Sequence, residues 1–271
     1  MELLTDDIVM GESPRWHDGR LWVSDWGRGL LLVVSADGKT EVAATGKGAF
    51  CFDFLPDGRL LVVTEGRLLA GEPFGPLEPY ADLSGLGVSY WNDIVVDGRG
   101  NAYVGALGFD FGSGASFAPG AVALVRPSGE AVRVADGVAF PNGIAVSADN
   151  GTLILAESYG KCLTGWDIAA DGTLSGQRVW AALGDGVPDG ICVDATGAVW
   201  YADVPNKCCV RVAEGGAVLD TVTLDRGAFA CMLGGSTLYV VANQWGGVGN
   251  TGDGRVFMTP APAPLAGWPG S

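Results

Sequence analysis

Residues 140–158 read FPNGIAVSADNGTLILAES, and residues 187–203 read VPDGICVDATGAVWYAD. Both stretches run from an apolar residue through Pro, Asn or Asp, and Gly into an apolar run, a polar turn, a second apolar run and a closing acid. Six copies of the turn and second run occur, and the second runs begin at Leu21, Leu60, Ala102, Leu153, Val199 and Leu238. A spacing of 39 to 51 residues between copies is typical of the blades of a β-propeller.

The two apolar runs of each copy are predicted to be paired strands, because Gly in the turn between them accepts the positive φ of a tight hairpin. VVSADGKTEV (33–42) and WDIAADGTLSGQRVW (166–180) are interpreted as outer strand pairs. We therefore predict an all-β fold, a six-bladed β-propeller with a central channel that forms a single domain over residues 1–271. The N-terminal segment DDIVMG (6–11) is predicted to complete the last blade and to hide sheet edges.

Composition and charge exclude several partners. The formal net charge of −15 and the pI near 4.3 disfavour nucleic acid and membrane surfaces, and they favour a cation. The N-terminus lacks a signal-like apolar stretch and no long apolar run follows, so a cytoplasmic protein is expected. The six cysteines form no CxxC pair and are interpreted as reduced, mostly structural thiols. The sequence predicts no oligomeric state.

Equivalent residues at the start of each first strand should form one ring, because the first strand of every propeller blade lines the channel. In chain order these residues are Glu12, Cys51, Asn92, Asn142, Asp189 and Phe229. Two carboxylates and two carboxamides that meet in a narrow channel need a counter-charge, which one divalent cation would supply. Oxygen ligands favour Ca²⁺ first, with Mn²⁺, Mg²⁺, Zn²⁺ or Fe²⁺ as alternatives.

The Asn-Gly and Asp-Gly pairs also have an ordinary interpretation, because both are common turn dipeptides. GESPRW and WNDIVV, however, put Glu12 and Asn92 at the same place without a following Gly. Turn chemistry alone therefore does not explain the ring.

Four motifs in the same order, the two quoted above together with GESPRWHDGRLWVSD (11–25) and WNDIVVDGRGNAYVG (91–105), resemble the SMP-30/gluconolactonase/luciferin-regenerating-enzyme family. The resemblance extends over nearly the whole chain. It implies a six-bladed propeller that holds one divalent cation and hydrolyses lactones, often of sugars. It also implies that Glu12, Asn142 and Asp189 bind the metal, that Asn92 reaches the substrate or the metal, and that Asp189 is the general base.

One position departs from the family pattern. Sugar-lactonase members commonly have Arg two residues before the Asn of the WND motif, whereas this chain has Tyr90. We therefore expect a less polar lactone or ester, with Tyr90 and Trp91 as aromatic walls of the substrate site. The Phe- and Gly-rich stretch 105–120 is predicted to be either a lid over the substrate or a packed connection. Asp25, Glu157 and Asp203 end the second runs and are expected either to support the ring from behind or to cap strand ends.

Two other functions remain open at this point. Related calcium propellers make organophosphate or phosphotriester hydrolysis an alternative, and a non-catalytic ligand-binding propeller is another. Four converging oxygen donors favour the enzyme over the scaffold. A serine hydrolase is disfavoured, because His17 is the only histidine and no GxSxG motif is present; His17 itself is expected in a turn or at the surface.

Overall fold

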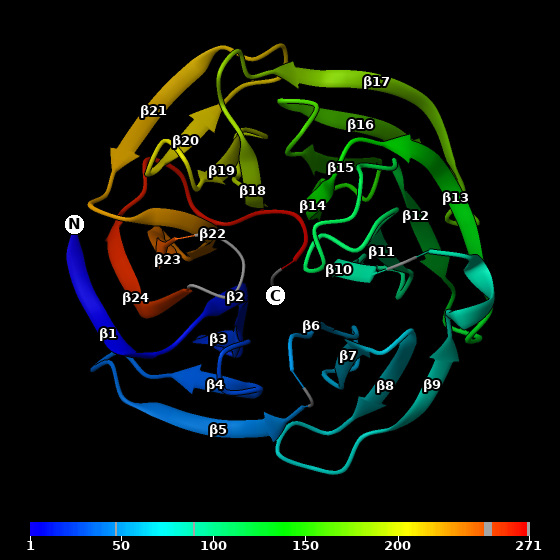
Figure 1. Ribbon diagram of the computed structural model, residues 1–271, viewed down its shortest axis with the longest axis horizontal. Coiled ribbons are helices and arrows are strands. Elements are labelled where there is room, and N and C mark those ends of the chain that lie inside the picture. Colours follow the sequence, from blue (N-terminus) through cyan, green and yellow to red (C-terminus); the bar gives the residue numbers. More distant parts are fainter. Residues whose placement is uncertain (47, 89, 247–250, 270–271) are drawn as a thin grey trace.

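Six antiparallel sheets of four strands each surround a central axis in the computed structural model, which describes residues 1–46, 48–88, 90–246 and 251–269 (Figure 1). The predicted all-β, six-bladed β-propeller is confirmed. Apart from one short 3-10 segment, Ser84–Leu86, no helix occurs among the described residues. In each of blades 1 to 5 the strands follow the order of the chain from the channel outward.

Strands of the first three blades have the following bounds: blade 1, β2 Gly11–His17, β3 Arg20–Asp25, β4 Leu30–Val34 and β5 Thr40–Thr45; blade 2, β6 Cys51–Phe54, β7 Leu60–Thr64, β8 Arg67–Gly71 and β9 Glu78–Asp82; blade 3, β10 Tyr90–Val96, β11 Ala102–Leu107, β12 Gly120–Val125 and β13 Ala131–Val138. The bounds in the other three are: blade 4, β14 Pro141–Val146, β15 Thr152–Glu157, β16 Cys162–Ile168 and β17 Leu174–Ala182; blade 5, β18 Pro188–Val193, β19 Val199–Asp203, β20 Cys208–Val212 and β21 Val218–Thr223; blade 6, β22 Gly227–Gly234, β23 Thr237–Trp245, β24 Thr251–Pro260 and β1 Glu2–Ile8.

The N-terminal strand β1 closes blade 6 by pairing with β24, as predicted. The strand begins earlier than the predicted segment 6–11 and ends at Ile8. The backbone N–H groups of Val9 and Met10 donate to the carboxylate of Asp25 at 3.0 Å, which turns the chain into blade 1. Gly11 therefore already belongs to β2.

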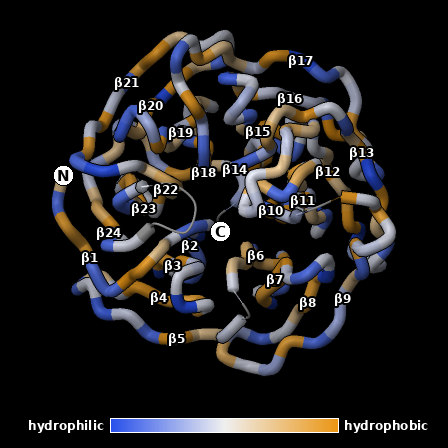
Figure 2. The backbone as a smooth tube through the Cα atoms, viewed as in Figure 1, coloured by the Kyte–Doolittle hydropathy of each residue, from blue (hydrophilic) through white to orange (hydrophobic). Residues whose placement is uncertain are grey.

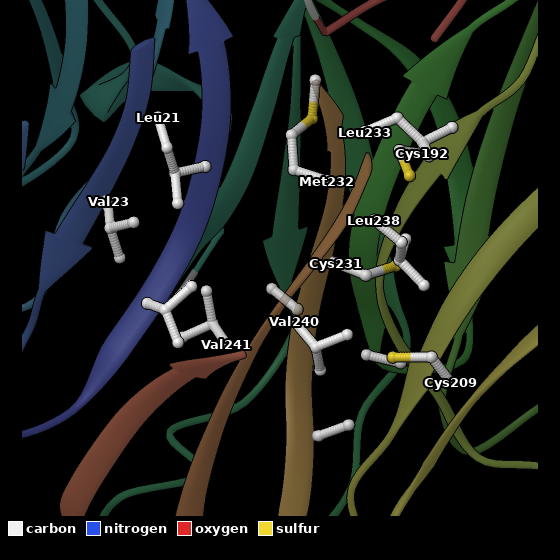
Figure 3. Close-up of a cluster of buried hydrophobic side chains, with 14 of the residues drawn as sticks. Leu21, Val23, Cys192, Cys209, Cys231, Met232, Leu233, Leu238, Val240 and Val241 are labelled. Carbon is white, nitrogen blue, oxygen red and sulfur yellow. The ribbon is translucent and has the colours of Figure 1, made fainter. Parts of the chain in front are cut away.

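The hydrophobic core lies between neighbouring blades rather than at the axis. Hydrophobic residues occur along the strands of every blade (Figure 2), and the buried ones form five clusters. Figure 3 shows one cluster, in which Met232 and Val240 of blade 6 pack between Cys192 of blade 5 and Leu21 of blade 1. The middle strands of a blade are buried on both faces, as in β11 and β12, and they are therefore nearly continuous apolar runs, whereas outer strands such as β9 and β21 are largely exposed.

The chain segment after β24, residues 261–269, crosses the face of the propeller opposite the starts of the inner strands. It forms backbone hydrogen bonds with Gly235 of blade 6, with Val193 of blade 5 and with Val146 of blade 4. In Figure 1 this segment runs toward the axis. The C-terminal segment therefore joins three blades at the far end of the channel.

Candidate active site

Three of the predicted ring residues, Glu12, Asn92 and Asn142, line one small polar cavity at the start of the inner strands. Its volume of about 10 Å³ is room for about one water molecule or ion. Asp189 occupies the equivalent place on β18, and the next residue, Gly190, lines the cavity. The structure thus brings the four oxygen-bearing residues together. Cys51 and Phe229, at the remaining ring positions, are buried.

A β-bulge at the ring position aims these side chains into the channel. The regular pairing of the inner strand with its neighbour is interrupted around Glu12, around Asn92, around Asn142 and around Asp189. Strand β6, which carries Cys51, has no such interruption. Bulges bend a strand and redirect a side chain, and they recur next to active sites.

The Gly of PNG and of PDG serves close packing between inner strands, because both motifs lie inside strands and not in turns. A Cβ added at Gly143 would lie 2.5 Å from the carbonyl oxygen of Asp189. A Cβ added at Gly190 would lie 2.5 Å from the Cβ of Ala230. The turn interpretation of these dipeptides is therefore wrong, and the two glycines let neighbouring ring residues approach each other.

Hydrogen bonds fix the amide of Asn142. Its Oδ1 accepts from Nδ2 of Asn92 at 3.1 Å, and its own Nδ2 donates to Oγ of Ser158 at 3.3 Å. The hydroxyl of Ser158 in turn donates to the carbonyl of Pro188 at 2.7 Å. The oxygen of Asn142 therefore faces Asn92 of the neighbouring blade. The sequence analysis missed Ser158, although it directly follows the predicted acid Glu157.

The electrostatics of the ring suit a cation. Burial, together with the charge of Asp93, raises the pKa of Glu12 to about 8. Burial, followed by the charges of Glu12, Asp93 and Asp203, raises the pKa of Asp189 well above the ordinary carboxyl range. No group of three or more His, Cys, Asp or Glu side chains within the described ranges has a metal-binding arrangement. A ring of two carboxylates and two carboxamides fits a hard, oxygen-preferring divalent ion.

A buried ion network that the sequence analysis missed forms the floor of the cavity. Arg15 is 3% exposed, lines the cavity, and donates to Oδ1 of Asp93 at 2.9 Å and to the carbonyl of Ile94 at 2.5 Å. Its Nε lies 3.6 Å from Oδ1 of Asp53. Asp53 also accepts from the N–H of Val96 at 2.7 Å. The guanidinium therefore neutralises part of the negative charge below the ring.

The three acids predicted to support the ring lie one layer behind it, where each binds backbone N–H groups of the connection that enters an inner strand. Asp25 accepts from the connection before Glu12, as described above. Glu157 accepts from Ala139 at 2.6 Å, and Asp203 accepts from Val187 at 2.9 Å. The acids therefore cap the connections into these strands, and their support of the ring stays a prediction.

Tyr90 and Trp91 lie beside the ring, where they line a second pocket between blades 2 and 3. Tyr90 is 39% exposed, and burial of its other atoms raises the pKa of the phenol to about 12, with further contributions from Cys51 and Glu12. Trp26, from blade 1, lines the ion-sized cavity itself.

The stretch 105–120 contains the end of β11, a loop over 108–119 and the first residue of β12. Phe109 of this loop packs against Phe140 and Tyr159 of blade 4, with ring centroids 5.8 and 6.3 Å apart. Phe140 and Tyr159 lie two residues before Asn142 and one after Ser158. The loop is thus packed beside the site, and its role as a lid stays a prediction.

His17 is buried, which contradicts the expectation of a turn or surface position. It ends β2 and is 8% exposed, and its ring stacks on Phe54 with centroids 3.8 Å apart. Aromatic packing between blades 1 and 2 therefore compensates for the burial of the polar imidazole of His17. All six cysteines are free thiols, and only Cys162 is more than slightly exposed.

No helix in the described part of the chain is long and apolar enough to cross a membrane.

The comparisons with known proteins agree with the motifs. The family model described as "SMP-30/Gluconolactonase/LRE-like region" matches residues 10–244. The chain is 26% identical over 246 residues to regucalcin of Danio rerio (86% of this chain, 82% of the relative), and 23% identical over 255 residues to a pentonolactonase of Haloferax volcanii (90% and 85%). A solved structure described as a calcium-binding protein, regucalcin, from Agrobacterium tumefaciens has a TM-score of 0.82 at 20% identity, and the match covers 98% of this chain and 94% of the other. The chain therefore belongs to the SMP-30/gluconolactonase/LRE-like family, as its motifs predicted.

Proposed function

We propose that this protein is a metal-dependent lactonase, a hydrolase that opens a cyclic ester with water. The ion-sized polar cavity that Glu12 and Asn142 line, with Asp189 directly before the lining residue Gly190, is the observation that supports this function most directly. The family and the pentonolactonase among the relatives support the same reaction class.

Glu12, Asn142 and Asp189 would hold one divalent ion, with Ca²⁺ as the first expectation. When bound, such an ion supplies positive charge that stabilises the oxyanion of the opening lactone. Asn92, whose amide already faces Asn142, orients the substrate. Bulges and loop contacts hold these side chains in place before substrate arrives, which lowers the entropic cost of reaction.

Asp189 is the general base of the proposed reaction. It takes a proton from the water that attacks the carbonyl carbon, the bond between that carbon and the ring oxygen breaks, and Asp189 returns the proton to the ring oxygen as it leaves. The product is an open-chain hydroxy acid. Tyr90, in place of a basic residue beside the ring, favours a lactone that is less polar than a sugar lactone.

The function is tested with metal-stripped protein reloaded separately with Ca²⁺, Mg²⁺, Mn²⁺ and Zn²⁺. Sugar, aliphatic and aromatic lactones are assayed by proton release, and a phosphotriester is included. Hydrolysis of a lactone only after reloading is the expected result. Full activity in excess chelator after extensive dialysis would show that the reaction needs no metal. Hydrolysis of the phosphotriester and of no lactone would make a phosphotriester the substrate class instead.

A further inference from the structure

A pocket of about 590 Å³ opens beside the ring, between blades 2 and 3. This volume lies within the range of pockets that bind small organic molecules. Six of its ten lining residues carry apolar or aromatic side chains, Ala49, Val63, Leu83, Val88, Tyr90 and Trp91, and the other four are Thr64, Glu65, Gly66 and Ser84.

Consecutive residues of β10 line the pocket and the ion-sized cavity. Tyr90 and Trp91 line the pocket, and Asn92, the next residue, lines the cavity. When the carbonyl group of a lactone lies at the ring, a substituent of the same lactone can therefore reach the pocket.

The polarity of the pocket selects the kind of substituent. Among the described residues that line it, Glu65 is the only charged one, and none is basic. An anionic group would meet this carboxylate and the net charge of −15 without a counter-ion. Gly66 adds room next to Trp91, because the closest atom to a Cβ built there is the indole Nε1, at 3.8 Å. An uncharged apolar group suits this environment.

Resting on the proposed lactonase function, we infer that this pocket is the subsite for an uncharged alkyl or aryl substituent of the lactone. The substrate class is then a substituted aliphatic lactone rather than a polyhydroxylated one. Burial of each additional methylene in the pocket raises kcat/KM about fourfold, until the pocket is full.

A series of γ-lactones, from γ-butyrolactone to γ-decalactone, tests this inference on the metal-loaded protein. We expect kcat/KM to rise about fourfold per methylene, and Val88→Asp, in the pocket wall, to abolish that rise. Val179→Asp on the outer strand β17 is the matched control, since Val179 is 64% exposed and far in sequence from the pocket, and this variant should keep the full rise. Ala49→Asp replaces Val88→Asp if the latter does not fold by circular dichroism.

A binding measurement separates failure of the subsite from failure of the lactonase proposal. Calorimetric titration with 2-alkylcyclopentanones, which water cannot open, should show affinity that increases with alkyl length in the wild type and not in Val88→Asp. Lactone hydrolysis without dependence on chain length would overturn the subsite and leave the lactonase proposal intact. Length-dependent ketone binding without hydrolysis of any lactone would support the pocket and overturn the reaction. A ketone affinity that does not change with alkyl length would overturn the subsite, whatever the result of the hydrolysis assay.

Discussion

Asn142 and Asp189 occupy equivalent places in neighbouring blades, and the residue behind each explains the difference between them. Ser158 accepts a hydrogen bond from the amide of Asn142. The residue at the corresponding place in blade 5, directly after Asp203, is Val204, whose side chain accepts no hydrogen bond. A carboxamide at position 189 would lack this acceptor, whereas a carboxylate does not need it. The site thus has a neutral oxygen donor in one blade and a carboxyl group in the next.

Asp189→Asn should therefore lower kcat for lactone hydrolysis at least about 100-fold, because it removes the general base while keeping the shape of the side chain. Asp185→Asn is the matched control, since it removes the same charge from a fully exposed side chain in the connection before β18. Steady-state kinetics of both variants, with circular dichroism to verify folding, provide the measurement. Wild-type kcat in Asp189→Asn would assign the base to another residue.

The raised pKa of Glu12, about 8, makes cation binding depend on pH. Both Glu12 and Asp189 bind protons more tightly in the fold than in the unfolded chain, so the metal-free protein loses stability as the pH rises from the ordinary carboxyl range toward 8. Below that pH a cation must displace a proton from Glu12. Calcium affinity should consequently fall at least about tenfold per pH unit below about pH 8, since Asp189, whose pKa is also raised, must lose its proton as well.

Thermal unfolding with and without Ca²⁺ measures this effect. The increase in Tm on adding Ca²⁺ should be larger at about pH 8.5 than at about pH 6, because the cation then relieves repulsion between ionised carboxylates. Glu12→Gln should remove most of the difference. An equal increase at both pH values in the wild type would contradict proton displacement from Glu12.

At the scale of strands and loops, the three acids behind the ring bind the connections that lead into β2, β14 and β18. Asp203 illustrates this, because its carboxylate accepts from the N–H of Val187 and from both the N–H and the Nδ2 of Asn206. It therefore binds the connection before β18 and the turn after β19 at the same time. The geometry of Asp189 depends on a residue that need not contact substrate.

Removal of this acceptor in Asp203→Ala should lower the free energy of unfolding by about 2–3 kcal/mol, since buried N–H groups lose a charged partner. Chemical denaturation of the metal-free protein measures the loss. Asp220→Ala, on the outer strand β21 where the side chain is exposed, should change the free energy by less than about 0.5 kcal/mol. If Asp203→Ala lost metal affinity at unchanged stability, the carboxylate would belong to the ion site and not to the loop.

The blades could be predicted from the sequence because hairpin turns and apolar runs are local signals that repeat. The ring could be predicted because the repeat aligns Glu12 with Asn142 and Asp189. The network below the ring could not, since Arg15 and Asp93 lie 78 residues apart and no local pattern pairs them. The bulges also escaped prediction: an extra residue changes which side of the strand a side chain faces, and only the paired strand shows it.

At the scale of the whole molecule, both ends of the chain stabilise the ring of blades. The N-terminal strand supplies the outer edge of blade 6, and the C-terminal segment bonds to blades 6, 5 and 4 at the far end of the channel. The hydrogen bonds between Trp268 and Val146, 2.7 and 2.8 Å long, are the last of these contacts. The C-terminal segment therefore ties separate blades together at the end of the channel opposite the candidate active site.

Trp268→Ala should lower the free energy of unfolding by about 2–3 kcal/mol, because the indole packs against the buried cluster between blades 3 and 4. Its effect on kcat/KM should be small, since Val146 lies at the end of β14 and Asn142 near its start. Leu219→Ala is the control for an exposed apolar side chain, 49% exposed on β21, and should change stability by less than about 0.5 kcal/mol. Denaturant unfolding and lactone kinetics on the same preparations separate the two effects. Loss of activity at wild-type stability would mean that the C-terminal segment shapes the candidate active site through the channel, and unchanged stability would mean that it does not tie the blades together.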